Sequence, residues 1–170
     1  MAARARATSV PRSLLRAGSG RRDRASLEIE ISDRQRRYRV SRRRVERVAQ
    51  AAHRAGRGPG GVVSILLSGD RRLRELNRQF RGLNRSTDVL SFPAGDVAPD
   101  GRRQVGDIAI SIETASRQAG AAGCSVAAEL DRLVAHGVLH LLGFDHEEDD
   151  GEMMGLQARI LRGLRRRRVR

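Results

Sequence analysis

The sequence HGVLHLLGFDH, residues 136–146, is the stretch around which the rest of the chain is best interpreted. It holds three of the chain's four histidines on an apolar background that is typical of a buried segment. His136 and His140 are four positions apart, so on a helix their imidazoles lie on one face, one turn from each other. Gly143 follows within a turn, where a positive φ can end a helix and fold the chain back. This return would bring His146 to the first two histidines.

Three imidazoles that converge in this way predict a zinc site. Neutral imidazole is a common zinc ligand, and three protein ligands leave one coordination position for water, which is typical of catalytic rather than structural zinc. We therefore expect one Zn²⁺ per chain, bound by His136, His140 and His146. The alternative is that these are core or surface histidines that cluster by chance, and the spacing and the glycine favour the metal. The isolated His53 is expected to be a packing or surface residue with no metal role.

The spacing also fits the H-E-x-x-H-x-x-G-x-x-H pattern of metzincin zinc proteases at every position except the second. Residue 137 is Gly, whereas those proteases have a Glu that takes a proton from the zinc-bound water. A zinc peptidase or other amidohydrolase would therefore need a base from elsewhere in the chain. It remains an alternative.

Four ordered motifs resemble the YbeY family, the metal-dependent endoribonucleases of rRNA maturation. The string H-G-x-L-H-L-x-G-[FY]-D-H is similar to the family signature, which has Gly at its second position. The three further matches are Phe80-Arg-Gly82 followed by Ser86-Thr-Asp-Val-Leu-Ser-Phe-Pro93, then Gly106-Asp-Ile108, and last the segment from Glu148 to Met154. The resemblance covers roughly residues 60–164, with the motifs in the same order as in the family.

The resemblance implies a single-strand-specific endoribonuclease that acts in rRNA processing and maturation and in ribosome quality control. It implies that Arg81 and His136 are catalytic and that Arg81 faces the metal cleft, where a guanidinium can bind two phosphate oxygens. The implied partners are single-stranded RNA, an rRNA precursor and the ribosomal small subunit, with no DNA and no membrane. A third possibility is a non-catalytic, ribosome-associated RNA-binding module.

No side chain of the motif is an evident general base for phosphodiester hydrolysis. A zinc-bound hydroxide could attack phosphorus, or the substrate's own 2′-hydroxyl could do so, and only the second route requires RNA. The sequence leaves both routes open.

The net charge of +14 lies at the two ends of the chain. Residues 1–58 contain 17 Arg and 5 acidic residues, and residues 161–170 contain 6 Arg and no acidic residue. Residues 59–160, which carry the motif histidines, contain 11 Arg and 15 acidic residues. Basic tails attract polyanions by counterion release. Because all 34 basic residues are Arg, which indicates a codon bias, the charge alone is weak evidence for RNA.

The composition predicts one domain without a membrane span. We expect residues 1–25 to be a disordered basic extension, residues 26–164 a single metal-dependent hydrolase domain, and residues 165–170 a basic tail. The single cysteine excludes an intrachain disulfide and fits a reducing compartment. These features favour a cytoplasmic protein, and an organellar protein with residues 1–25 as its transit peptide is the less favoured alternative.

Apolar periodicity predicts an α+β fold in which a small mixed sheet of about four strands packs with about five helices. Strands are expected at 27–31, 62–67, 88–92 and 106–111. Helices are expected at 41–56, 70–81, 111–122, 125–143 and beyond 150. The helix over 125–143 is apolar around most of its circumference, so it should be the central buried helix with the zinc site at its end. In the helix over 70–81, Leu73, Leu76 and Phe80 are expected to form one buried stripe.

Overall fold

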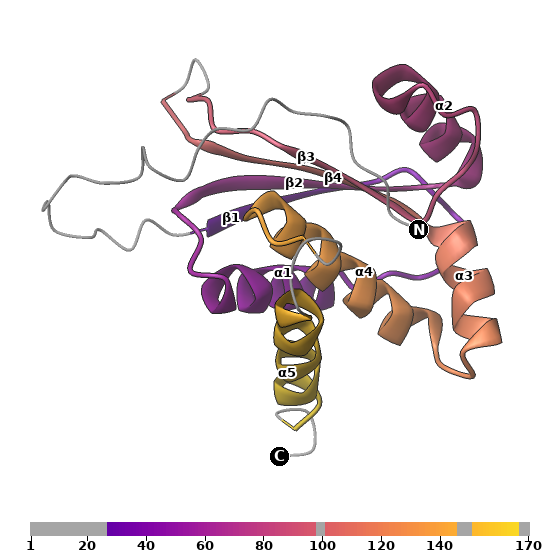
Figure 1. Ribbon diagram of the computed structural model, residues 1–170. Coiled ribbons are helices and arrows are strands. Elements are labelled where there is room, and N and C mark those ends of the chain that lie inside the picture. Colours follow the sequence, from indigo (N-terminus) through magenta and orange to yellow (C-terminus); the bar gives the residue numbers. More distant parts are fainter. Residues whose placement is uncertain (1–26, 98–100, 146–150, 167–170) are drawn as a thin grey trace, which may run out of the picture.

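The computed structural model describes residues 27–97, 101–145 and 151–166 (Figure 1). Over these residues the chain forms four strands and five helices, as the α+β prediction requires. Their order is β1 (Leu27–Asp33), α1 (Arg42–Ala55), β2 (Gly61–Ser68), α2 (Asp70–Arg81), β3 (Val89–Pro93), β4 (Gln104–Ser111), α3 (Ile112–Ala121), α4 (Val126–Leu141) and α5 (Glu152–Arg166). The predicted N-terminal extension, residues 1–25, lies outside the described residues, as do the last four residues of the predicted basic tail.

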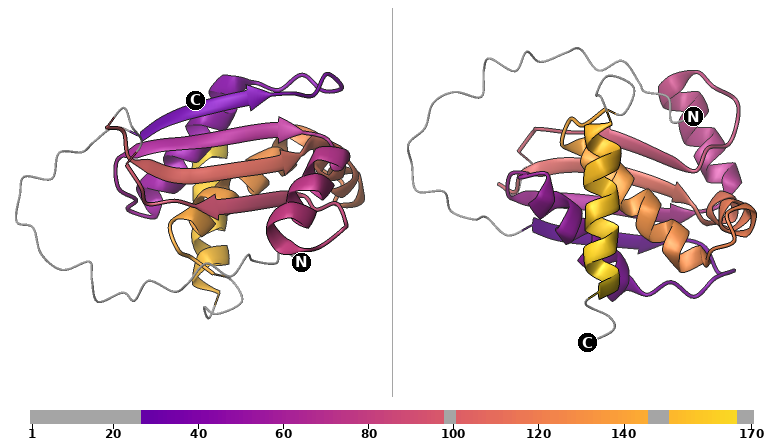
Figure 2. Two further views of the ribbon diagram at one scale, coloured as in Figure 1. Left: turned by 90° about the horizontal axis from the view of Figure 1, so that it is seen from above. Right: turned by 60° about the horizontal axis from the view of Figure 1, so that its bottom comes forward.

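The four strands form one mixed sheet in the order β1-β2-β4-β3, seen from above in Figure 2. β1 pairs with β2 and β2 with β4 in parallel, whereas β3 is antiparallel to β4 and forms an edge. Parallel neighbours need a crossover connection, which α1 supplies between β1 and β2. The register places Ser91 of β3 opposite Ile108 of β4.

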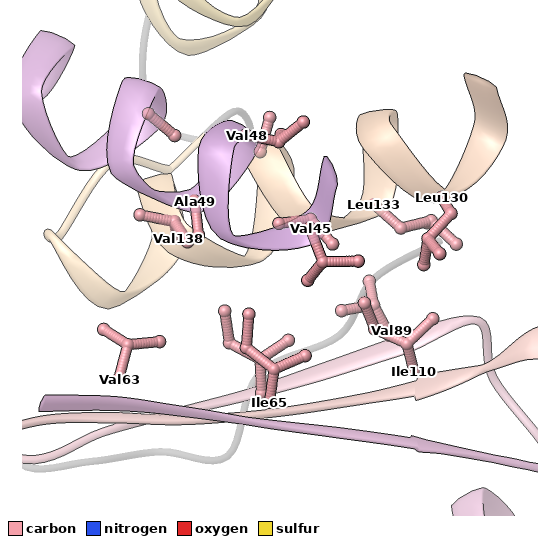
Figure 3. Close-up of a cluster of buried hydrophobic side chains, with 14 of the residues drawn as sticks. Val45, Val48, Ala49, Val63, Ile65, Val89, Ile110, Leu130, Leu133 and Val138 are labelled. Carbon is pink, nitrogen blue, oxygen red and sulfur yellow. The ribbon is translucent and has the colours of Figure 1, made fainter. Parts of the chain in front are cut away.

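Helices cover both faces of the sheet (Figures 1 and 2). α1 and α4 lie on one face, α2 lies on the other, and α3 lies at one end. α5 packs against α1 and α4. Successive side chains of a strand point to opposite faces. Ile65 and Ile110 therefore face the large core beneath α1 and α4 (Figure 3), whereas Leu90 and Ala109 face Leu73 and the rest of α2.

α4 is the central buried helix that the sequence predicts. Ser125 caps its N-terminus, where the side chain accepts a hydrogen bond from the Ala128 N–H. Leu133, Val134 and Val138 are fully buried between α1 and the sheet. Ser41 and Ser111 cap α1 and α3 in the same way.

The predicted buried stripe of α2 is wrong at Phe80. Leu73 and Leu76 are buried, but Phe80 is 49% exposed. Its ring lies edge-on to Phe92, with 5.0 Å between ring centroids. Because Phe92 belongs to the edge strand β3, the last turn of α2 meets the rim of the sheet, where water reaches one side of the ring. Within the described residues, none of the helices is long and apolar enough to cross a membrane.

Candidate functional site

His136 and His140 lie on the same face of the C-terminal half of α4, as their spacing predicts. Their Nε2 atoms are 3.1 Å apart, and their rings cross at 82°. His136 is 6% exposed, and His140 is half-buried. Two ring nitrogens therefore point to one place at the surface end of a buried helix.

The donor set of this pair fits zinc. In a tetrahedral site with Zn–N distances of about 2.0–2.1 Å, two nitrogen ligands lie about 3.3 Å apart, close to the separation of the two Nε2 atoms. Two bare lone pairs at this distance repel each other, so either a shared cation or one ring hydrogen must lie between them. The pair can thus form one edge of a metal tetrahedron.

The chain folds back after α4 as predicted. α4 ends at Leu141, and Gly143 adopts φ 88°, a left-handed conformation that glycine reaches without strain. The Gly143 and Phe144 N–H groups donate to the carbonyls of His140 and Leu139, at 3.0 and 3.1 Å. Residue 146 lies outside the described residues, and in the part of the chain that is described no group of three metal-ligating side chains occurs. The third ligand, His146, therefore remains a prediction.

Arg81 lies at the last residue of α2 and lines a hollow of about 260 Å³. The hollow lies between the end of α2, the segment that leads into β3, and α3. Its described lining contains neither His136 nor His140 and consists of Asn77, Arg81, Leu83, Arg85, Ser86, Thr87, Asp88, Thr114 and Gln118. The placement of Arg81 at the metal cleft therefore remains a prediction.

The wall of this hollow contains buried polar atoms that have no hydrogen-bond partner in the described part of the chain. The Asn77 amide donates to the Arg85 carbonyl at 2.8 Å, and the Gln118 amide donates to Asp88 at 3.0 Å. The side-chain oxygens of Asn77, Ser86 and Gln118 are buried and make no hydrogen bond to any of the described residues. Buried polar atoms are normally hydrogen-bonded to protein or to ordered water. This wall therefore suits water or a polar ligand that carries N–H or O–H donors.

Arg132 of α4 lies between the hollow and the two histidines. Arg132 lies four residues before His136 and thus one turn away on the same face. Its guanidinium donates to Glu129 and lies 3.8 Å from Asp88, which lines the hollow. Burial raises the pKa of Asp88. Hydrogen bonds from Gln118 and the Val89 N–H and the charge of Arg132 lower it by more than burial raises it, so the pKa lies below its usual value. Asp88 is therefore an anion at neutral pH.

Comparison with known proteins identifies the family. A family model described as Endoribonuclease YbeY matches residues 28–165. The chain belongs to the YbeY family. A relative named Endoribonuclease YbeY from Anaeromyxobacter sp. is 47% identical over 122 residues, which cover 71% of this chain and 62% of that protein. A relative of the same name from Moorella thermoacetica is 42% identical over 157 residues, which cover 84% of this chain and all of that protein.

A solved structure supports the fold. The match is to the solution structure of a Thermotoga maritima protein that is 28% identical in sequence. It covers 78% of this chain and 86% of that protein, with a TM-score of 0.53. The chain spans less than two thirds of the length of the Anaeromyxobacter relative.

The YbeY-like motifs at β3, β4 and α4 come together in the fold although they are separated in sequence. Ser91 of β3 donates through its hydroxyl to the Gly137 carbonyl at 3.3 Å. Ile108 of β4 lies beside the same glycine. Arg81 is the last residue of α2, a helix that lies on the opposite face of the sheet from α4 (Figure 1).

Sequence reasoning missed Gln157 of α5. This residue is 4% exposed, and its Oε1 atom lies 3.1 Å from Nδ1 of His136. No motif predicts a glutamine 21 positions away as a partner of a histidine. The available signal is weaker: Gln157 is the polar member of the stripe in which Met153 and Ile160 are buried. His53, by contrast, is a packing residue as expected, with Nε2 2.7 Å from the Pro59 carbonyl.

Proposed function

We propose that this protein is a zinc-dependent, single-strand-specific endoribonuclease of rRNA processing and maturation and of ribosome quality control. The observation that carries the proposal is the pair of Nε2 atoms 3.1 Å apart, on the YbeY signature helix of a chain that belongs to this family. His136, His140 and His146 would hold one Zn²⁺. Such an ion supplies Lewis acidity at a phosphoryl oxygen and at a water ligand.

Arg81 is the proposed phosphate-binding residue. Its guanidinium keeps its charge at every physiological pH and can hold two phosphate oxygens as negative charge develops on them. Arg85 adds a second cation to the hollow. Ribose hydroxyls or base amino groups carry the donors that the Asn77 and Gln118 oxygens require. The hollow therefore suits a nucleotide of the RNA strand.

The natural partners follow from the family and remain part of the proposal. They are single-stranded RNA, an rRNA precursor and the ribosomal small subunit, in the cytoplasm. The excess of arginine over acidic residues supports attraction to a polyanion.

Cleavage of a labelled single-stranded RNA, with zinc quantified in each sample, tests the proposal. Wild type should cut and hold about one zinc per chain, as a three-histidine site predicts. Arg81→Ala should keep its zinc and lose about 100-fold or more in turnover, the usual effect of removing one group that stabilises transition-state charge. Arg78→Ala, at an exposed arginine in the same turn of α2, is the matched control and should cut normally.

Three outcomes would contradict the proposal. Cleavage by His140→Ala in metal-free buffer would exclude the zinc mechanism. RNA binding without cleavage by wild type would favour the binding-module alternative. Hydrolysis of a peptide but not of RNA, unaffected by Arg81→Ala, would favour the peptidase. An all-deoxy substrate separates the two nucleophiles, because attack by a 2′-hydroxyl requires RNA.

A further inference from the structure

We propose that Gln157 is a positioning residue for His136, an inference that rests on the proposed zinc site. Its side-chain carbonyl accepts the hydrogen on Nδ1 of His136 and so leaves the Nε2 lone pair directed at the metal position.

The contact is short and shielded. Oε1 of Gln157 lies 3.1 Å from Nδ1 of His136, and both residues are more than nine-tenths buried. An amide oxygen can only accept, so the shared hydrogen belongs to Nδ1. In a neutral imidazole with its hydrogen on Nδ1, Nε2 carries no hydrogen and presents a lone pair. The glutamine therefore selects the tautomer that can bind a metal through Nε2.

The second histidine is consistent with this tautomer. Nε2 of His140 lies 3.1 Å from Nε2 of His136. If Nε2 of His136 carries no hydrogen, it accepts one from Nε2 of His140 while no metal is bound. For both Nε2 atoms to hold a zinc ion, this hydrogen would move through solvent to Nδ1 of His140, whereas the His136 ring would keep its tautomer and its partner on α5.

The packing of α5 holds the amide in place. Met153 and Ile160, one turn to either side of Gln157, are buried in the same core as α4. Both of these neighbours are apolar, so the buried amide among them needs a polar partner, which Nδ1 of His136 supplies. Partners of this kind fix the ring orientation of metal-binding histidines in other proteins, and their loss typically lowers metal affinity.

The test compares Gln157→Met, Gln157→Glu and the control Ile160→Val in the full chain. Two quantities are measured: zinc affinity by competition with a chelator, and the His136 tautomer from ¹⁵N NMR of the metal-free protein at a pH where imidazole is neutral. Gln157→Met removes the acceptor at similar volume. Gln157→Glu keeps an acceptor and cannot donate. Ile160→Val perturbs the same stripe one turn away and leaves the amide of Gln157 in place.

We expect wild-type His136 to carry its hydrogen on Nδ1. Gln157→Met should lose about 10- to 100-fold in zinc affinity and populate both tautomers, whereas Gln157→Glu should bind zinc at least as tightly as Ile160→Val does. Unchanged zinc affinity in Gln157→Met, or a wild-type hydrogen on Nε2, would overturn the inference and leave the proposed zinc site intact. If wild type itself binds no zinc, the proposed function fails first, and the inference fails with it.

Discussion

A Cβ atom at position 137 would lie 2.9 Å from Cγ2 of Ile108, closer than side-chain atoms approach one another in folded proteins. It would also lie 3.3 Å from Oγ of Ser91. Successive helical residues are rotated by about 100°, so residue 137 faces the sheet while His136 faces α5. Glycine is therefore the residue that lets α4 lie close to β3 and β4. The glutamate of the metzincin pattern has no room here.

Gly137→Ala should destabilise the protein. Alanine is a better helix former than glycine by about 1 kcal/mol, but forcing a methyl group into a packed contact costs about 1–3 kcal/mol. We expect a net loss of unfolding free energy in urea titrations. Gly155→Ala is the matched control, because a Cβ there meets nothing within 4 Å in α5, and it should stabilise the protein by about 0.4–1 kcal/mol. Equal stabilisation by both substitutions would contradict the prediction, because it would show that α4 can shift away from the sheet to accommodate the methyl group.

The helices were predictable because their signals are local. Ser41, Ser111 and Ser125 each precede an apolar period, and each caps a helix in the structure. The sequence also showed that residue 137 lacks a catalytic carboxylate. It could not show that this position touches Ile108, because the contact depends on how α4 lies on the sheet.

Contacts between distant elements account for what the sequence did not predict. Phe80 fits the apolar period of α2 but meets the edge of the sheet, and helical spacing carries no information about where a sheet ends. Gln157 reaches His136 only because α5 packs across α4. Asp131 of α4 binds Arg44 of α1, 87 positions away, and no local pattern indicates that pairing.

The Arg44–Asp131 ion pair should contribute measurably to stability. Nε and Nη2 of Arg44 each donate to one carboxylate oxygen at 2.8 Å, and the two side chains are only 23% and 17% exposed. Hydrogen bonds to charged groups contribute about 1.5–3 kcal/mol, so Asp131→Asn should lower the unfolding free energy by about that amount. A double-mutant cycle with Arg44→Met measures the coupling. The exposed pair Arg71–Glu75, at 3.8 Å, is the control and should show less than about 0.5 kcal/mol. Equal coupling in the two cycles would contradict the prediction.

Asp70 should make stability depend on pH in the acid range. Burial raises the pKa of Asp70, but hydrogen bonds from Ser111 and Thr114 and the charge of Arg117 lower it more, to about 2. A carboxyl whose pKa is depressed by folding stabilises the protein above its unfolded pKa of about 3.9, and this contribution is lost as the pH falls through the folded pKa. Asp70→Asn should therefore be less stable than wild type at pH 7.

Urea midpoints measured between pH 7 and pH 2 test this expectation. The midpoints of wild type and Asp70→Asn should converge as the pH falls from about 4 to about 2. The exposed Asp107 supplies the control substitution Asp107→Asn. The difference between its urea midpoint and that of wild type should not change with pH over the same range. A constant difference between wild type and Asp70→Asn would show that the aspartate acts by packing rather than by charge.

Arg132 of α4, one turn before His136, should contribute to the unfolding free energy of the protein. Its guanidinium donates through Nε to Glu129 at 2.9 Å, and Glu129 is buried. Arg132→Met would leave that carboxylate buried without its cation, at a cost of about 1.5–3 kcal/mol. Adding Glu129→Gln removes the uncompensated charge, so the double variant should recover part of the loss. If urea unfolding shows the double variant to be as unstable as Arg132→Met alone, the stabilisation comes instead from the 3.8 Å contact of Arg132 with Asp88, which remains broken in both variants.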